Sequence, residues 1–146
     1  PVGEGCAERS EAITLSAMGI RRNESRNMFA MTIRRLAEEA RLSGAVVAGG
    51  MIWLAGQVAD DASADAEAQT ADILQQIDTL LAEAGTDKRA LLQVQIVLAD
   101  IADAPAMNRA WDAWLDRSAK PARMTIQAPL VNPAWRVEIT GIARAP

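Results

Sequence analysis

The sequence predicts an α+β domain in which one mixed β-sheet carries two helices on a single face. Two observations lead to this prediction. Short apolar runs bounded by turn residues predict strands, and two longer segments repeat their apolar residues at helical spacing. The predicted order is β-β-β-α-β-α-β-β, and a sheet of this kind buries one face against its helices.

Three strands are expected first. Residues 32–37 suit an edge strand, and Ser43–Ala48 and Met51–Val58 are apolar runs separated by Gly49-Gly50. Because glycine supplies the positive φ that a tight turn requires, the last two runs should form a hairpin.

A helix is expected within residues 63–84. The segment Asp60-Asp61-Ala62-Ser63 provides a start signal and Gly85 a stop signal. One helical face collects the apolar residues Ile73, Leu74, Ile77, Leu80, Leu81 and Ala84.

The second half of the domain repeats the pattern of strand and helix. In residues 90–98, Leu92, Val94, Ile96 and Leu98 should point one way and Gln93 and Gln95 the other. Asp103 is expected to cap the second helix, with Pro105 in its first turn. Residues 123–128 and 135–143 should form the last strands. The apolar stripe of the helix, which we interpret as core packing, is Met107, Ala110, Trp111, Trp114 and Leu115.

The sheet face turned away from the helices is predicted to be partly apolar. Trp53 and Val97 fall on the less regular sides of their strands. The alternate positions that we assign to this face on the last two strands are Arg123, Thr125, Gln127, Arg136, Glu138, Thr140 and Ile142. A half-apolar outer face favours burial against another copy of the chain.

Composition excludes several kinds of site. The 146 residues contain no His and a single cysteine, Cys6, so His-based triads, Cys-His dyads, His-based zinc sites and disulfides within the chain are ruled out. No metal site is expected.

The net charge is −4, and the 11 basic and 15 acidic residues after residue 30 carry all of it. An acidic domain argues against nucleic acid as a partner.

Residues 1–30 differ from the rest because their apolar residues show no sustained period. We expect them to be an extension, disordered or non-native, preceding a domain that spans residues 31–146. No run approaches the ~18 apolar residues of a membrane span. We therefore expect a cytoplasmic protein without a membrane partner.

Two charged residues are the candidates for chemistry. Arg123 follows Pro121-Ala122 at the start of a strand, and Glu138 lies between the apolar Val137 and Ile139. A lone Arg at a strand end is commonly a solvated surface charge, and Glu138 could equally face solvent or belong to a site.

Several separated segments together resemble a known family. The matching segments are Ala48-Gly49-Gly50-Met51-Ile52, Leu54-Ala55-Gly56-Gln57, Leu80-Leu81-Ala82-Glu83-Ala84-Gly85, Leu98-Ala99-Asp100, Met107-Asn108 followed by Trp111, Pro121-Ala122-Arg123-x-Thr125, and Val137-Glu138-Ile139. In this order and spacing, the chain from about Leu42 onward resembles the reactive intermediate deaminase (Rid) family, also called YjgF or L-PSP endoribonuclease-like proteins.

The resemblance implies a chorismate-mutase-like fold and a homotrimer with sites in the clefts between subunits. It also implies hydrolysis of 2-imino acids to 2-oxo acids and ammonia, without metal or cofactor. In that reaction Arg123 would bind the substrate carboxylate through two parallel N–H donors. Glu138 would orient or deprotonate the attacking water. Gly56, Thr125, Asn108 and Leu42 match family positions that line the substrate site.

The chain also departs from the family pattern. Many active members carry Tyr where this chain has Leu42, and some carry Cys where it has Thr125. Three functions therefore stay open, in this order: an imine deaminase, a non-catalytic or regulatory carboxylate-binding trimer, and an endoribonuclease. The acidic, His-free composition argues against the third, because phosphodiester cleavage needs acid–base groups and phosphate neutralisation.

Overall fold

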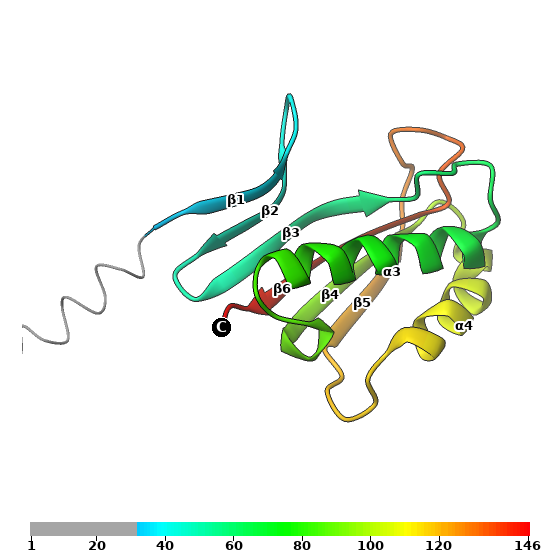
Figure 1. Cartoon of the computed structure of the whole chain (residues 1–146). Coiled ribbons are helices and arrows are strands. Elements are labelled where there is room, and N and C mark those ends of the chain that lie inside the picture. The colour runs from blue at the N-terminus through cyan, green and yellow to red at the C-terminus, as the bar shows by residue number, and fades with distance from the viewer. Residues whose placement is uncertain (1–31) are drawn as a thin grey trace, which may run out of the picture. The chain divides into compact units, whose positions relative to one another are not determined.

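The computed structural model describes residues 32–146, and residues 33–146 form one compact unit (Figure 1). The expectations for residues 1–30, including that for Cys6, lie outside the described residues. The element order confirms the predicted α+β arrangement. In chain order the elements are β1 (Arg34–Glu38), β2 (Ser43–Ala48), β3 (Met51–Val58), α3 (Ala66–Glu83), the short 3-10 helix η2 (Lys88–Ala90), β4 (Leu91–Leu98), the short 3-10 helix η3 (Ile101–Asp103), α4 (Ala104–Trp114), β5 (Ala122–Gln127) and β6 (Val137–Arg144).

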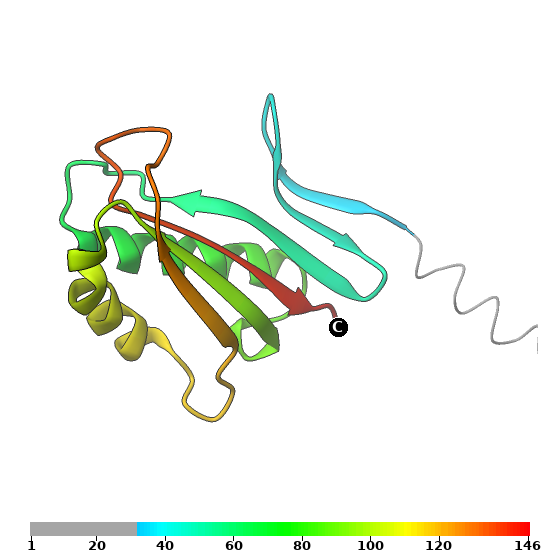
Figure 2. The ribbon, with the colours of Figure 1, turned by 180° about the vertical axis from the view of Figure 1, so that it is seen from behind.

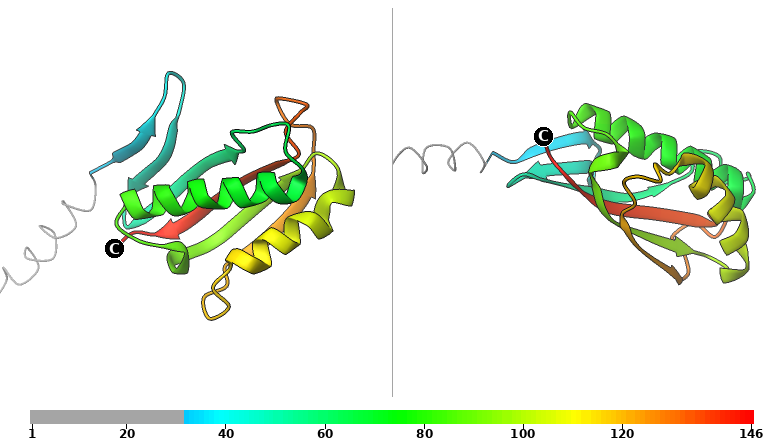
Figure 3. Two further views of the ribbon diagram at one scale, coloured as in Figure 1. Left: turned by 45° about the vertical axis from the view of Figure 1, so that its right-hand side comes forward. Right: turned by 90° about the horizontal axis from the view of Figure 1, so that it is seen from below.

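The six strands form one sheet in the order β1-β2-β3-β6-β4-β5. All neighbouring pairs are antiparallel except β4 and β5, which are parallel and connected through α4. Both helices lie on one side of the sheet, which we call the helix face (Figures 1 and 3). Seen from behind, no other described element covers the opposite side, which we call the open face (Figure 2).

The hydrophobic core fills the space between the helix face and α3. The predicted stripe of α3 is confirmed, since Ile73, Leu74 and Ile77 are at most 1% exposed. From the sheet, the side chains buried beneath the helices include Ala45, Ile52, Leu54, Val94, Ile96, Leu98, Val137 and Ile139. The core is aliphatic except for Trp111, which α4 contributes.

The start of α3 differs from the prediction. The residue that caps the helix is Asp65, whose carboxylate accepts the Ala68 amide at 2.8 Å, and not the segment 60–63. Asp61 instead accepts both the hydroxyl and the amide of Ser63 in the preceding turn. Both aspartates suit a cap, and the chain continues through one more turn before becoming helical.

Asp103 stands at the N-terminus of α4, as predicted, but its side chain makes no capping hydrogen bond. Its carboxylate binds the guanidinium of Arg136 instead, with Oδ1 2.6 Å from Nη2 and Oδ2 2.9 Å from Nε. A two-pronged charged pair is a stronger partner for the carboxylate than a single amide.

Leu92 is 49% exposed and does not join Val94, Ile96 and Leu98 on the helix face, which corrects the predicted alternation of β4. Leu91 pairs with Ala143 and Gln93 with Ile142, so β4 has one extra residue at this point. Such a β-bulge shifts the phase of a strand by one residue, and Leu91 takes the buried position.

The predicted face of the β5 side chains is also wrong. Arg123, Thr125 and Gln127 pair with the buried residues of β4, so they belong to the helix face. Met124 and Ile126 are the β5 residues on the open face. Arg136 lies just before β6 and turns towards Asp103, whereas Glu138, Thr140 and Ile142 do lie on the open face.

Candidate functional site

The first part of the candidate site lies on β5, at the edge of the sheet, and we call it the arginine half. Arg123 and Thr125 project from the helix face, two residues apart. Pro121 precedes the strand and restricts the residue before the proline, Lys120, to an extended backbone. The Arg123 guanidinium carbon lies 5.2 Å from the centre of the Trp111 ring, on α4.

Neither polar group of the arginine half is satisfied within residues 32–146. No carboxylate there pairs with Arg123. The Thr125 hydroxyl is shielded from solvent and has no hydrogen-bond partner in the same part of the chain. A charged fork beside an unpaired hydroxyl offers several donors to an anion, because guanidinium and hydroxyl both donate to carboxylate oxygens.

The second part lies on the open face, where β3 and β6 meet, and we call it the glutamate half. β3 carries an extra residue between Leu54 and Gln57, opposite Thr140. The Thr140 hydroxyl fixes this bulge by donating to the Leu54 carbonyl at 2.6 Å. The bulge presents Gly56 to the half-buried side chain of Glu138.

Gly56 is a requirement of this geometry. A Cβ at this position would overlap Glu138 Oε1 and lie 2.9 Å from Cδ and 3.2 Å from Cγ. The carboxylate therefore occupies the space that any other residue at position 56 would fill. No residue in the described part of the chain forms an ion pair with Glu138.

The two halves do not meet within one chain. Arg123 pairs with Val94, and Val94 pairs with Gly141. Glu138 pairs with Val97. Arg123 and Glu138 are thus two strands apart, offset by three residues along the strands, and on opposite faces of the sheet.

The two remaining predicted site residues also stand apart. Asn108 is half-buried on α4, one turn before Trp111, and no hydrogen bond joins it to Arg123 or Thr125. Leu42 is 51% exposed in the turn between β1 and β2, at the edge of the sheet opposite to β5.

A buried amide anchors the segment that leads into Glu138. Gln69, on α3, is fully buried and accepts the Arg136 amide at 2.8 Å, two residues before Glu138. Its own NH2 group donates to the carbonyls of Ala62, Ala64 and Ala134. Gln69 therefore joins the loop that follows β3 to the loop that precedes β6.

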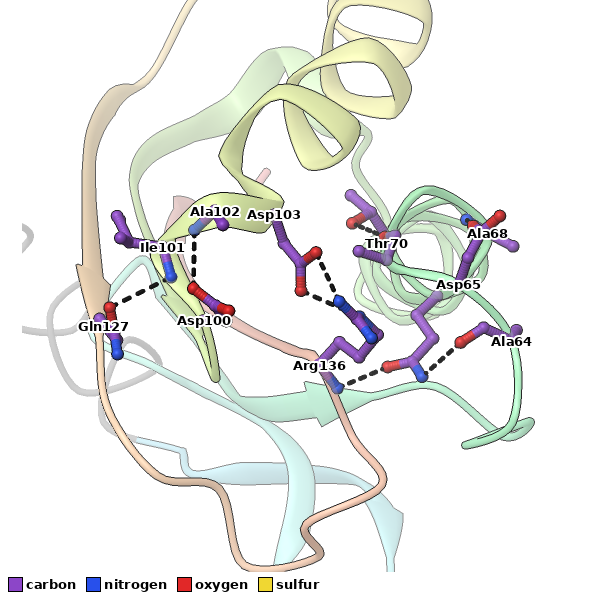
Figure 4. Close-up of polar contacts among 12 residues, drawn as sticks. Ala64, Asp65, Ala68, Thr70, Asp100, Ile101, Ala102, Asp103, Gln127 and Arg136 are labelled. Atoms are coloured by element: carbon purple, nitrogen blue, oxygen red, sulfur yellow. Dashed lines mark hydrogen bonds and ion pairs between the residues drawn. The ribbon is translucent and has the colours of Figure 1, made fainter.

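A charged pair reinforces this end of the sheet (Figure 4). Asp103 holds Arg136 with two hydrogen bonds, and this bonding raises the pKa of the Arg136 guanidinium above its ordinary value. Close by, the side-chain carbonyl of Gln127 accepts the Ile101 amide at 3.2 Å (Figure 4). These contacts hold the termini of β5, β6 and α4 together.

Residues 32–146 contain neither a metal-binding cluster nor a membrane-spanning helix. No group of three Cys, Asp or Glu side chains there is arranged to hold a metal ion. None of the helices in that range combines the length and hydrophobicity needed to span a bilayer.

Sequence reasoning missed the contact between Trp111 and Arg123. The sequence predicts core packing for Trp111, and its side chain is indeed only 4% exposed. The helical spacing of Trp111 predicts a core position and nothing more. It therefore does not reveal that the ring also contacts the Arg123 guanidinium. The anchoring by Gln69 was missed as well, since a glutamine within a helix is normally exposed.

The fold and the sequence segments that carry the resemblance both match one family of proteins. The sequence matches the family described as Endoribonuclease L-PSP over residues 32–145. A solved structure of a YjgF-family member from Neisseria meningitidis superposes with a TM-score of 0.77 and 44% identity, covering 80% of this chain and 98% of that one. The chain belongs to this family, which confirms the resemblance found in the sequence.

Curated relatives agree with this assignment. The RutC family protein YoaB of Escherichia coli is 44% identical over 113 residues, which are 77% of this chain and 98% of the relative. A RutC family protein of Haemophilus influenzae is 42% identical over 114 residues, 77% of this chain and 98% of the relative. The 3-aminoacrylate deaminase RutC of Acinetobacter baylyi is 35% identical over 79 residues, 54% of this chain and 62% of that protein.

Proposed function

We propose that the protein hydrolyses reactive 2-imino acids to 2-oxo acids and ammonia, with Arg123 as the carboxylate clamp and Glu138 as the proton-transfer group. The observation that carries this proposal is that, within residues 32–146, the Arg123 guanidinium has no carboxylate partner and the Thr125 hydroxyl, two residues along the same strand face, has no hydrogen-bond partner. A relative named as a 3-aminoacrylate deaminase adds support for the reaction class, because 3-aminoacrylate is the enamine tautomer of a 3-imino acid and so also pairs a carboxylate with a hydrolysable C=N group.

The reaction needs few groups. Water adds to the C=N carbon, and the proton that it loses passes to Glu138. The same carboxyl group returns this proton to the nitrogen, which gives a carbinolamine that carries a hydroxyl and an amino group on one carbon. Glu138 then takes the hydroxyl proton as the carbonyl forms and delivers it to the nitrogen, so the C–N bond breaks and ammonia and a 2-oxo acid leave. Arg123 holds the substrate carboxylate at two points and so fixes the position of the reacting carbon. Neither step requires an oxidant, a reductant or a metal.

The separation of the two halves supports a site shared between copies of the chain. Since Arg123 and Glu138 lie on opposite faces of one sheet, a small substrate can touch both only if they come from different subunits. We propose a homotrimer in which the arginine half of one subunit faces the glutamate half of the next.

The open face has the surface that such an assembly would bury. Trp53, Met124 and Ile126 are 43%, 46% and 38% exposed on it in the single chain. A hollow of about 210 Å³ lies at its centre, between Trp53 and the polar side chains of Gln93, Gln95 and Thr140. Large apolar side chains gathered on one sheet face are typical of an interface between subunits.

One assay tests the function. Ammonia and 2-oxo acid release from freshly generated 2-imino acids is compared among the wild type, Arg123→Ala and Arg117→Ala. Arg117 is an exposed residue between α4 and β5, so its removal changes the net charge equally. We expect turnover in the wild type and Arg117→Ala and its loss in Arg123→Ala. Equal rates in all three would refute the clamp.

Leu42 favours a second candidate, a carboxylate-binding trimer without turnover. Its side chain has no proton to transfer, whereas many active family members carry Tyr at the matching position. Binding of 2-oxo acids that depends on Arg123, together with no acceleration of imine hydrolysis in any variant, would establish this alternative.

A further inference from the structure

We infer that Trp111 is a positioning residue of the carboxylate clamp: its indole ring holds the Arg123 guanidinium ready for two-point binding. This inference rests on the proposed function, because it concerns the same arginine. It assigns Trp111 a role beyond the core packing that its spacing predicts.

Arg123 needs such support because nothing else described holds it. The side chain is exposed on an edge strand, and no carboxylate within residues 32–146 pairs with it. A free arginine side chain loses rotamer entropy when it binds a ligand, which weakens binding. A ring 5.2 Å from the guanidinium carbon reduces that loss by favouring one position beforehand.

An aromatic ring suits this task better than a carboxylate would. A carboxylate would use the N–H donors of the guanidinium and neutralise its charge. A ring attracts the cation through its face and leaves the N–H groups at the edge of the plane available for a ligand. The clamp therefore keeps both its charge and its two parallel donors.

The ring is itself held in place. Trp111 is 4% exposed, and its neighbour Trp114 packs against it with ring centres 5.5 Å apart. The Trp114 indole N–H donates to Asp78 on α3 at 2.8 Å, and Lys88 lies 4.9 Å from the Trp114 ring centre. The position of Arg123 is thereby tied to α3 and α4 through two indoles.

Binding of 2-oxobutanoate and of its uncharged methyl ester, measured by calorimetry, tests this role. Trp111→Leu should weaken binding of the acid about 3- to 30-fold and leave the ester unaffected. Trp111→Phe keeps a ring and should fall between the wild type and Trp111→Leu. Trp135→Phe, a tryptophan in the β5–β6 connection whose indole N–H donates to the Ala59 carbonyl, is the matched control and should bind like the wild type.

Kinetics supply a readout that lost packing would not produce. Trp111 acts on the free protein by favouring the binding-ready position of Arg123, and the bound clamp has the same geometry with or without the indole. Trp111→Phe should therefore raise KM and leave kcat nearly unchanged. Destabilised packing would instead lower the active fraction and with it kcat.

A third measurement needs no folded variant at position 111. In the wild type, a guanidinium lying over an indole ring should show side-chain proton resonances shifted upfield by the ring current. Loss of those resonances in Arg123→Lys assigns them. An Arg123 signal at an ordinary chemical shift would refute the contact between the guanidinium and the indole ring.

The outcomes separate this inference from the proposed function. If the wild type binds acid and ester equally, the clamp itself is wrong, and the role of Trp111 fails with it. If the wild type prefers the acid and Trp111→Leu prefers it to the same degree, only the role of Trp111 is refuted.

Discussion

Replacing Gly56 with Ala should disable the proposed proton-transfer group without unfolding the protein. The new Cβ would overlap Glu138 Oε1 and come within 2.9 Å of its Cδ. These atoms belong to the end of a flexible side chain, so the carboxylate can move aside. It must move on the order of 1 Å, and a misplacement of that size can cost about 100-fold in rate.

The expected result of Gly56→Ala is therefore a roughly 100-fold lower kcat for 2-imino acid hydrolysis, with a melting temperature within a few degrees of the wild type. Ammonia release and thermal unfolding measure the two quantities. Gly50→Ala is the matched control. Its φ is +77° and nothing lies within 4 Å of the added Cβ, so it should lose roughly 1–2 kcal/mol of stability and keep its turnover.

A double-mutant cycle decides whether Gly56→Ala acts through Glu138. In a Glu138→Ala background the added methyl group meets no carboxylate, so Gly56→Ala should lower the rate no further. Two independent losses that multiply in the double variant would refute the reasoning, and so would full activity in Gly56→Ala alone.

Four further expectations concern the clamp, the assembly, an anchor and a turn. Arg123→Lys keeps the charge but not the fork and should lower kcat/KM for 2-imino acids at least about 10-fold, with circular dichroism unchanged. Light scattering at micromolar concentration should give three times the 15.6 kDa chain mass, and a monomer would refute the shared site. Gln69→Leu leaves buried backbone groups unpaired and should lower the free energy of unfolding, measured by chemical denaturation, by about 3 kcal/mol or more. Gln75→Leu, at an exposed position on the same helix, should change it by no more than about 0.5 kcal/mol. The Ser63 hydroxyl and amide lower the pKa of the Asp61 carboxyl. The stability that these hydrogen bonds contribute is therefore present at neutral pH and is lost as the pH falls through the lowered pKa. Ser63→Ala should raise the pKa of Asp61, as measured by NMR titration.

The helices and most strands could be predicted because their patterns are local. The stripe around Ile73 and Ile77 repeats over several turns, and Gly49-Gly50 permits little other than a tight turn. The bulge at Leu92 could not be predicted, because the extra residue is defined only by the register with β6.

The face of Arg123 was mispredicted for a related reason. β5 alternates polar with apolar residues, and a polar set is normally placed away from the helices. Here the apolar residues Met124 and Ile126 belong to the open face, and Arg123 lies beside a helix. The rule assumes that the polar residues of a strand point away from the helices, and in β5 the polar residues lie on the helix face instead.

The candidate site was predictable as a set of residues but not as an arrangement. The family resemblance selected Arg123, Glu138 and Gly56 as candidates, and the contact between Gly56 and Glu138 follows from a bulge that the sequence does not mark. No local pattern links Trp111 to Arg123, since the pairing depends on the crossover from α4 to the edge of the sheet.

The buried amide of Gln69 has a consequence for changes of chain length. The amide hydrogen-bonds to the backbone of Ala62, Ala64, Ala134 and Arg136. A residue inserted next to any of them would break one of these bonds and leave buried polar groups without a partner. Val131, in the same β5–β6 connection, is 95% exposed. A peptide tag or a fluorescent label is therefore best inserted at Val131, where the connection can lengthen without disturbing the anchored residues that lead into Glu138.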